Sequence, residues 1–349
     1  MLLSKIHLHN FRNFKDSKFD FGSSLTLIVG DNARGKTSLL EGMYTGIHGR
    51  GFRESREFEL ITWHEAQALV EVWIGDREVE TIFQVNLQKI EADRVEKTFY
   101  VSKSKKSYFQ YKRLQTKAVL FSPEQISLIT GSPGRRRRYF DEVLTTIDKN
   151  YGKHLRNYEN ALRQRNKILE NYIDESELES ELEFWDQSIV SDAVYITAKR
   201  ASYIEYLNKH PQVDGKKFSL DYKKDECTKD RLEEVFSLEK RLRRTTIGPQ
   251  KDDVVIYLHD GNDKKDIHLY GSRSEQRLAV FWLKLNEIRI IEENYEVSPV
   301  LLLDDVFSEL DVSNKKLVMR VIEEYQTVIT STDDHLEELA RMPEKVIRL

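Results

Sequence analysis

The stretch that most constrains the fold of this chain reads GDNARGKTS and occupies residues 30–38. It fits the pattern G-x-x-x-x-G-K-S/T, follows an apolar run at residues 25–29 and opens a segment of helical character. A glycine-rich turn between a strand and a helix presents backbone N–H groups that can wrap a phosphate. The sequence therefore predicts an α/β fold with a phosphate-binding loop.

Each position of this loop has an expected role in binding a nucleoside triphosphate. Lys36 reaches the β- and γ-phosphates and assists catalysis, while Thr37 holds Mg²⁺. Ala33 stands where many such loops carry glycine. The alternative is a glycine turn that carries G-K-T by coincidence, and the strand and helix on either side argue against it. The loop residues that we expect to contact the nucleotide are Gly30, Asp31, Asn32, Ala33, Arg34, Gly35, Lys36, Thr37 and Ser38.

A second motif, VLLLDDVFSELD at residues 300–311, is an apolar strand that ends in two carboxylates. A strand that is apolar on both faces belongs inside a parallel sheet, and we expect it next to the strand that precedes the phosphate loop. Asp304 then holds Mg²⁺ through a water molecule, as a partner of Thr37, and Asp305 activates or orients the attacking water. The alternative is a strand capped by acids for solubility. The presence of a phosphate loop in the same chain favours the catalytic interpretation.

A third motif, YGSRSEQR at residues 270–277, opens a predicted helix with a second possible anion site. Ser272, Ser274 and the first helical amides can bind an anion, and Arg273 and Arg277 add positive charge. Because the phosphate loop already surrounds the triphosphate, we expect this site to reach the γ-phosphate of a nucleotide held by a second subunit. The alternative is an ordinary helix that is capped by Ser272 or Ser274.

The character of the chain changes between its two ends. Short alternating or apolar runs predict strands near both termini, whereas the central part is almost free of glycine and rich in Glu, Lys, Arg, Leu and Tyr. We expect two long helices there, at residues 135–172 and 177–210, without a sustained heptad. The predicted organisation is an α/β head built from residues 1–134 and 245–349, interrupted by a mostly helical lobe at residues 135–244.

Composition and charge limit the remaining possibilities. Cys227 is the one cysteine among 349 residues, which excludes an intrachain disulfide and a multi-cysteine zinc site and favours a reducing compartment. The apolar runs are far too short to span a membrane, and the N-terminal residues lack a signal-peptide core, so we expect a cytoplasmic protein without a membrane partner. The net charge of −4 means that nucleic acid would have to bind at a local basic patch.

One candidate patch is the run of arginines at residues 135–138. Positive charges at the start of a helix oppose its macrodipole. Asp141 and Glu142 can offset the last two arginines at i,i+4. Arg135 and Arg136 gain nothing locally, which indicates an anionic partner such as the phosphate backbone of DNA or an acidic protein face. The alternative is a solvated helix face.

A second candidate patch is SKSKKSYFQYKR at residues 102–113, where lysines and aromatic residues are mixed. Basic and aromatic side chains together suit a loop that follows a DNA strand. Lys105 and Lys106 are the phosphate contacts that we expect in this loop. The alternative is an exposed β-hairpin whose aromatic residues pack inward.

Taken in order, these motifs resemble the ABC-type ATPases of the SMC class, and most closely their RecF family of bacterial DNA replication and repair proteins. The blocks that carry the resemblance extend along the whole chain: NFRNF with GDNARGKTSLLEGMY, FSPEQISLITGSPGRRRRYFDEVL, GPQKDD, and YGSRSEQR with LLLDDVFSELD. The chain departs from the family pattern at Ala33, at Gln250 and Lys251 where the family has His-Arg, and at Phe140 and Asn314. The resemblance implies an α/β fold, an ABC-type P-loop ATPase head with a mostly helical inserted lobe.

The resemblance also implies roles for single residues. Arg12 and Asn13 approach the nucleotide, and either Glu124 or Gln125 senses the γ-phosphate at the position of the Q-loop. Asp311 belongs to the D-loop at the dimer seam. The segment that contacts the nucleotide of the second subunit consists of Ser272, Arg273, Ser274, Glu275 and Gln276. The residues that replace the switch histidine of transporter-type relatives are Thr330, Ser331 and Thr332.

In function, the resemblance implies an ATP-dependent DNA-binding protein of recombinational repair. ATP and Mg²⁺ drive a head-to-tail homodimer that clamps DNA at a gap or a single-strand/double-strand junction. Weak, DNA-stimulated hydrolysis through Asp305 acts as a timer that releases the DNA. With RecO and RecR, the protein helps to load RecA. The alternatives are an SMC-like structural protein, for which the helical arm is too short, and a defence-system ATPase, whose extra nuclease carboxylates are missing; a GTPase would need an N-K-x-D motif.

Overall fold

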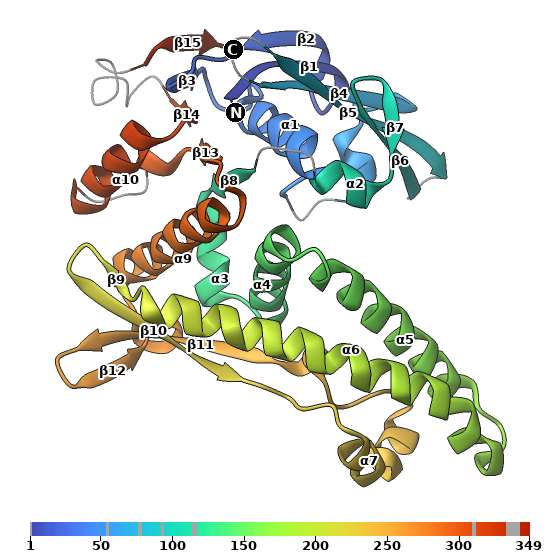
Figure 1. Ribbon diagram of the computed structural model, residues 1–349. Helices are drawn as coiled ribbons and strands as arrows, with labels where there is room; N and C mark the ends of the chain where they lie inside the picture. Colours follow the sequence, from blue (N-terminus) through green and yellow to red (C-terminus); the bar gives the residue numbers. More distant parts are fainter. Residues whose placement is uncertain are drawn as a thin grey trace. The chain divides into compact units, whose positions relative to one another are not determined.

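The computed structural model describes residues 2–53, 56–75, 79–91, 94–113, 117–308, 312–332 and 343–349 (Figure 1). The chain divides into two units. Unit 1 comprises Met1–Glu124 together with Glu287–Leu349, and unit 2 comprises Gln125–Asn286. Unit 1 therefore combines segments from both ends of the chain.

A five-stranded parallel sheet, in the order β15-β3-β14-β13-β8, lies in unit 1. Its strands are β3 (Leu25–Val29), β8 (Ala118–Phe121), β13 (Val300–Asp304), β14 (Thr327–Ser331) and β15 (Lys345–Arg348). Every residue of β3, β8, β13 and β14 is buried, which explains their continuous apolar sequences. The expectation that β13 lies next to β3 is wrong, because β14 lies between them and pairs with both.

A six-stranded antiparallel sheet, in the order β2-β1-β4-β5-β6-β7, also belongs to unit 1. Its strands are β1 (Leu2–Phe11), β2 (Phe14–Asp20), β4 (Gln67–Gly75), β5 (Glu80–Glu91), β6 (Arg94–Val101) and β7 (Ser104–Lys106). Side chains alternate between buried and more exposed along β4, as expected for a sheet with one face on the core. The buried face shares one apolar core with the parallel sheet.

Helix α1 (Lys36–His48) packs against both sheets of unit 1. Two of its glycines allow a close approach to the antiparallel sheet. A Cβ atom on Gly42 would lie 2.7 Å from Leu8 Cδ2, and one on Gly46 would lie 2.5 Å from Val72 Cγ1. This packing holds in place the helix that begins at the phosphate loop. The other helices of unit 1 are η1 (Glu57–Leu60), α2 (Tyr108–Arg113), η4 (Val306–Ser308) and α10 (Val312–Glu324), and η2 (Pro123–Ile126) crosses into unit 2.

Unit 2 contains the long helices expected in the centre of the chain (Figure 1). The long helices are α4 (Pro133–Ile147), α5 (Tyr151–Asn171) and α6 (Glu175–Lys209), and the unit also contains the shorter α3 (Ser127–Thr130), α7 (Lys229–Leu242) and α8 (Ile267–Tyr270). The single helix expected at residues 135–172 is divided into α4 and α5. The division lies at Asp148, whose Oδ1 accepts hydrogen bonds from the N–H groups of Asn150 (2.8 Å) and Tyr151 (3.3 Å) at the start of α5. Neither α6 nor any other helix in the described residues is long and apolar enough to cross a membrane.

Unit 2 also contains a four-stranded antiparallel sheet, in the order β12-β11-β10-β9. Its strands are β9 (Gln212–Val213), β10 (Lys216–Lys223), β11 (Asp253–Asp260) and β12 (Asp263–Asp266), with η3 (Pro249–Lys251) before β11. The expected lobe boundaries of 135–244 are too narrow, since unit 2 also contains residues 125–134 and 245–286. Pairing of β10 with β11 draws in the later segment, and Trp282 of α9 (Arg273–Tyr295) stacks on Phe218 of β10 at a ring-centroid distance of 5.4 Å.

Candidate functional site

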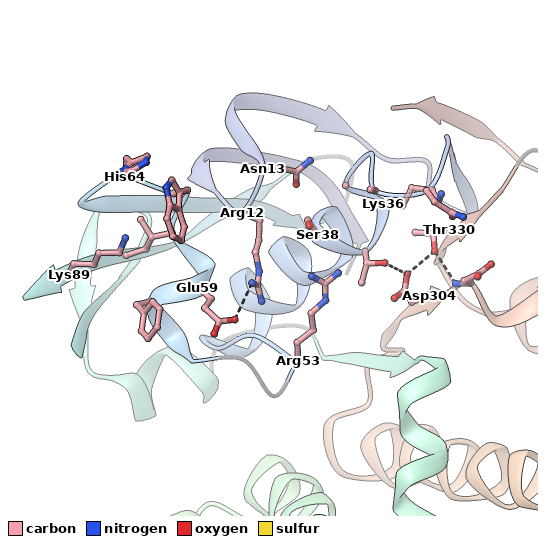
Figure 2. Close-up of a pocket in the computed structure, with 18 residues that line it drawn as sticks. Arg12, Asn13, Lys36, Ser38, Arg53, Glu59, His64, Lys89, Asp304 and Thr330 are labelled. Atoms are coloured by element: carbon pink, nitrogen blue, oxygen red, sulfur yellow. Dashed lines mark hydrogen bonds and ion pairs between the residues drawn. The ribbon is translucent and has the colours of Figure 1, made fainter. Parts of the chain in front are cut away.

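A cavity of about 930 Å³ opens in unit 1, where β3, β13 and β14 end (Figure 2). Parallel strands end at the same edge of a sheet, so the residues that follow them meet there. The expected nucleotide-site residues on the cavity wall are Arg12, Asn13, Asn32, Ala33, Gly35, Lys36, Thr37, Ser38, Asp304, Asp305 and Thr330. The wall residues that the sequence analysis missed are Arg53, Phe58, Glu59, Ile61, Trp63, His64 and Lys89. The structure thus brings together motifs from both ends of the chain.

The phosphate loop leads into a helix start that suits an anion. Helix α1 begins at Lys36, directly after Gly35, with no side-chain cap and no acidic residue in its first turn. The first amides of such a helix can bind a phosphate. The ammonium group of Lys36 donates hydrogen bonds to the carbonyl oxygens of Gly30 (2.5 Å) and Asp31 (3.0 Å). The loop therefore places the Lys36 ammonium next to the N–H groups at the start of α1.

Two positions of the loop have a left-handed backbone. Gly35 has a φ of 105°, and a Cβ atom there would lie 2.4 Å from Asn13 Nδ2. Asn13 Nδ2 in turn donates a hydrogen bond to the carbonyl oxygen of Arg34 at 3.2 Å. Ala33 has a φ of 67°, a conformation that costs a residue with a Cβ atom about 1–2 kcal/mol relative to the right-handed one. This explains why loops of this type usually carry glycine at the position of Ala33.

The acidic end of β13 is joined to the phosphate loop through hydroxyl groups. Thr37 Oγ1 donates a hydrogen bond to Asp304 Oδ1 at 2.9 Å, and Thr330 Oγ1 donates to the same oxygen at 2.9 Å. Thr330 Oγ1 also accepts a hydrogen bond from the N–H group of Asp305 at 2.9 Å. Asp305 is left-handed, with a φ of 47°. The carboxylate of Asp304 and the backbone of Asp305 are therefore held at defined places beside the loop.

The surroundings of Asp304 fit a magnesium ion. Burial raises the pKa of Asp304, while the Thr330 and Thr37 hydrogen bonds and the charge of Arg53 lower it. The carboxylate is 8% exposed, and within the described residues we find no ion pair at this group. A threonine hydroxyl beside a buried carboxylate is a set of oxygen ligands that Mg²⁺ prefers. Thr37 and Asp304 are the residues that would hold the ion.

Two arginines that line the cavity, Arg12 and Arg53, both contact the buried glutamate Glu41 of α1. Glu41, which is fully buried, accepts hydrogen bonds from Arg12 Nε (2.7 Å) and Arg12 Nη2 (3.2 Å). Arg53 Nη1 lies 3.9 Å from Glu41 Oε2, and Figure 2 shows its side chain reaching into the cavity. Arg12 was expected near the nucleotide, whereas Arg53 was missed because it lies in a connecting segment without a motif. Both guanidinium groups give this wall positive charge.

Aromatic and apolar side chains also line the cavity. They are Phe58, Ile61, Trp63 and His64. The Trp63 side chain is 82% exposed, and its ring meets the His64 ring edge to face at a centroid distance of 5.3 Å. In the view of Figure 2, His64 and Lys89 lie at one end of the cavity, away from Lys36 and Asp304. The sequence has no motif that announces this end.

The serine cluster belongs to unit 2 and forms the helix cap named above as its alternative. Ser272 N–H donates to Glu275 Oε2 at 2.8 Å, and Glu275 N–H donates to Ser272 Oγ at 3.3 Å, so the pair is a capping box at the start of α9. Ser272, Arg273 and Ser274 are exposed. Gln276 is buried, and its amide nitrogen donates to the carbonyl oxygen of Ile267 at 3.1 Å. The amide of Gln276 is thus engaged inside unit 2, and its expected contact with the nucleotide of a second copy stays a prediction.

Glu124 and Gln125, the two candidate sensors of the γ-phosphate, are not among the residues that line the cavity within unit 1. Gln125 is the first residue of unit 2, on η2, and its side chain is half-buried. Glu124, the alternative γ-phosphate sensor, is exposed. Asp311 lies outside the described residues.

The arginine run at the start of α4 is largely occupied by contacts within unit 2. Arg136 Nε and Nη2 donate to the two carboxylate oxygens of Asp253 at 2.7 and 3.0 Å, and Arg136 Nη1 donates to the carbonyl oxygen of Gly131 at 2.9 Å. The expectation that Arg136 contacts DNA is therefore corrected. Asp141, expected to offset Arg137, instead pairs with Arg200 at 2.8 Å.

The lysine-rich segment has the hairpin form named above as its alternative. Lys105 is exposed and Lys106 is half-buried, both on β7, which pairs with β6. The aromatic residues that follow point inward: Tyr111 is fully buried and donates to the carbonyl oxygen of Gly46 at 2.5 Å. Tyr108 packs on Phe99 at a centroid distance of 5.2 Å. Lysines alone remain as DNA candidates in this segment.

Comparisons with known proteins agree with this architecture. Residues 5–337 match a family model described as an AAA domain. The DNA replication and repair protein RecF of Agathobacter rectalis is 32% identical over 342 residues, which cover 95% of this chain and 92% of that relative. A solved structure of "the recombination mediator protein RecF-ATPrS in RecFOR pathway" is 30% identical, with a TM-score of 0.88 over 100% of this chain and 96% of that one. An Smc head bound to a winged-helix domain of ScpA is 17% identical with a TM-score of 0.52, and so shares the fold. The chain therefore belongs to the RecF family.

Proposed function

We propose that this chain is an ATP-dependent DNA-binding protein of recombinational repair. In this proposal, ATP binds with Mg²⁺ in the unit 1 cavity and drives two copies together head to tail around two nucleotides. The closed dimer clamps DNA at a gap or a single-strand/double-strand junction, and slow hydrolysis opens it. The observation that carries the proposal is the 2.9 Å hydrogen bond between Thr37 and Asp304, which joins a phosphate loop to a buried acidic strand end.

The binding step uses groups that are already in place. The amides at the start of α1 and the Lys36 ammonium can take phosphate oxygens in place of the loop carbonyls that now accept from Lys36. Thr37 and Asp304 hold Mg²⁺, which neutralises charge on the phosphates when it is bound. Arg12 and Arg53 add positive charge along the same wall. Binding of the triphosphate thus rests on unit 1 alone.

The hydrolysis step needs a group that orients water. Asp305 lines the cavity next to Asp304, and the Thr330 hydroxyl fixes its backbone N–H group at 2.9 Å. A carboxylate carried on a backbone fixed in this way can accept a proton from an attacking water. We assign this role to Asp305 and expect weak, DNA-stimulated hydrolysis that serves as a timer.

The dimer supplies the rest of the site. Ser272, Arg273 and Ser274 are exposed at the start of α9, and helix starts favour anions. In the proposed dimer they meet the γ-phosphate bound by the second copy. The solved relative is described as part of the RecFOR pathway, which supports RecO and RecR as partners, with RecA loading as the outcome. Exposed Lys105 and half-buried Arg135 are the remaining DNA candidates.

The proposal is tested by the size of the protein in solution. Light scattering with ADP, with ATP, and with ATP plus gapped DNA should give a monomer, a dimer and a dimer on DNA. Asp305→Asn should keep the dimer closed for longer because hydrolysis is slowed, and Lys36→Met should stay monomeric. A protein that binds ATP fully and remains monomeric in all three conditions would overturn the proposed clamp.

A further inference from the structure

Trp63 is an exposed aromatic side chain in the wall of the unit 1 cavity. Its relative exposure is 82%, whereas Trp282 is fully buried. An indole ring is a large apolar surface, and leaving it in water gives up the burial that usually stabilises aromatic residues. Exposed apolar surface inside a concave site often marks a place where a ligand packs. Trp63 is therefore a candidate ligand contact that no motif in the sequence indicates.

The segment that carries Trp63 is tied to the sheet on its N-terminal side. Ile61 forms an isolated antiparallel bridge with Phe11 at the end of β1. The next residue, Thr62, donates its N–H group to the carbonyl oxygen of Asn10 at 2.8 Å. Trp63 thus follows directly on two residues that β1 holds in place.

The segment is also tied on its C-terminal side. Glu65 N–H donates to the carbonyl oxygen of Thr62 at 3.0 Å and closes a tight turn around Trp63. Lys89 of β5 holds this turn with its ammonium on the carbonyl oxygen of Glu65, at 2.9 Å. His64, with a φ of 69°, sets its ring edge to face against the indole. The indole is exposed and yet carried on a fixed turn, which is what a preformed platform requires.

The cavity has one charged end and one aromatic end, and a nucleotide likewise has charged phosphates at one end and an aromatic base at the other. Lys36 and Asp304 lie at the phosphate and metal end, whereas His64, whose ring contacts Trp63, lies at the other end (Figure 2). Both sets line one continuous space, and Figure 2 shows the two ends separated along it. A triphosphate seated on the loop leaves its base to the aromatic end.

We propose that Trp63 is the base platform of the nucleotide site and stacks its indole on a purine ring. The proposal rests on the proposed function in one respect: it requires a nucleotide whose phosphates occupy the loop at residues 30–38. It adds a specificity-determining residue to that site. Purines have a larger ring face than pyrimidines, so the platform favours purine over pyrimidine triphosphates.

The test separates base binding from phosphate binding. Calorimetry would compare ATP, CTP and inorganic tripolyphosphate, each with Mg²⁺, on the wild type, Trp63→Ala and Trp63→Phe. Loss of base–aromatic stacking should weaken ATP binding by roughly 5- to 150-fold in Trp63→Ala, narrow the ATP/CTP ratio and leave tripolyphosphate binding unchanged. Trp63→Phe should restore most of the ATP affinity, because phenylalanine keeps a stacking face.

Controls keep the outcomes distinct. Trp185→Ala in unit 2 should bind all three ligands as the wild type does, and Trp63→Ala should keep the wild-type thermal midpoint because the side chain is exposed. Unchanged ATP affinity in Trp63→Ala would overturn the platform, and so would an equal loss of ATP and tripolyphosphate. If ATP affinity depends on Trp63 but ATP produces no dimer, the base platform is supported and the dimeric clamp is overturned. If the wild type binds neither ATP nor tripolyphosphate, both the platform and the clamp are overturned.

Discussion

The hydroxyl of Thr37 donates a hydrogen bond to Asp304 at 2.9 Å, although 267 positions separate the two residues in the sequence. Thr330, on the strand between those that lead to Thr37 and Asp304, donates to the same carboxylate oxygen at 2.9 Å. Three chain segments thus meet at one oxygen because parallel strands end at a common edge. These hydrogen bonds can form only when the first and last parts of the chain fold together.

Asp304→Asn should lower ATP turnover without lowering the stability of the protein. Asparagine keeps an oxygen that can accept both hydroxyl hydrogen bonds but removes a charge whose burial raises the pKa of Asp304. We expect the thermal midpoint without nucleotide to be unchanged or higher, and Mg²⁺-dependent ATP turnover to fall by roughly 10- to 100-fold or more. Asp20→Asn, an exposed carboxylate, is the matched control. A less stable variant with full turnover would contradict the assigned role.

Ala33→Gly should stabilise the protein. The left-handed backbone at Ala33, with a φ of 67°, is strained for alanine, whereas glycine adopts it freely. Relief of about 1–2 kcal/mol, less about 0.4–1 kcal/mol for the freer unfolded chain, predicts a net gain of about 0.5–1 kcal/mol in unfolding free energy. Urea unfolding measures it. Ala161→Gly in α5 is the control and should cost about 1 kcal/mol; equal losses in both variants would exclude strain at Ala33.

Lys117 should give unit 1 a distinctive pH dependence. Burial lowers the pKa of Lys117 from 10.5 to about 8, even though its ammonium donates to the carbonyl oxygen of Lys112 at 2.7 Å. Between pH 8 and 10.5 the unfolded chain therefore binds more protons than the folded one, so the stability of the wild type relative to Lys117→Met rises with pH. Unfolding free energies at both ends of this window measure the difference. A flat profile for Lys117→Met would contradict the pKa direction.

The basic residues should divide into DNA contacts and packing residues. Lys105→Ala should lower the salt dependence of DNA binding by about 0.7–0.9 in log–log slope and leave the thermal midpoint unchanged. Arg136→Ala should instead lower the thermal midpoint, because it leaves Asp253 without its bidentate partner. Binding at several salt concentrations and thermal melts distinguish the two. If Lys105→Ala leaves the slope unaltered, β7 is not a phosphate contact.

The nucleotide site is predictable from sequence where its motifs are local. The phosphate loop announces itself through glycine spacing between a strand and a helix, and β13 through its apolar run and final acids. Their meeting through Thr37 and Asp304 follows from the parallel sheet. The order of the strands does not, because nothing in β13 or β14 indicates which of them pairs with β3.

The errors arise where long-range contacts decide. The division of α4 from α5 depends on the Asp148 carboxylate binding backbone amides, and the wider extent of unit 2 depends on the pairing of β10 with β11. Arg136 finds Asp253, which is 117 residues away. Trp63 is not predictable from the sequence, because exposure at a cavity wall is a property of the folded chain.

The most direct test of the central claim, that each nucleotide site is shared by two copies, is to mix two inactive variants. Lys36→Met lacks nucleotide binding but keeps Ser272, and Ser272→Arg binds ATP but blocks the site of its neighbour. In a mixed dimer, the phosphate loop of the second variant meets the intact Ser272 of the first. We predict that an equal mixture recovers ATP hydrolysis, up to about a quarter of the wild-type rate, since half of the dimers carry one complete site. A mixture that forms mixed dimers by light scattering and yet hydrolyses ATP no faster than the separate variants would contradict the shared site.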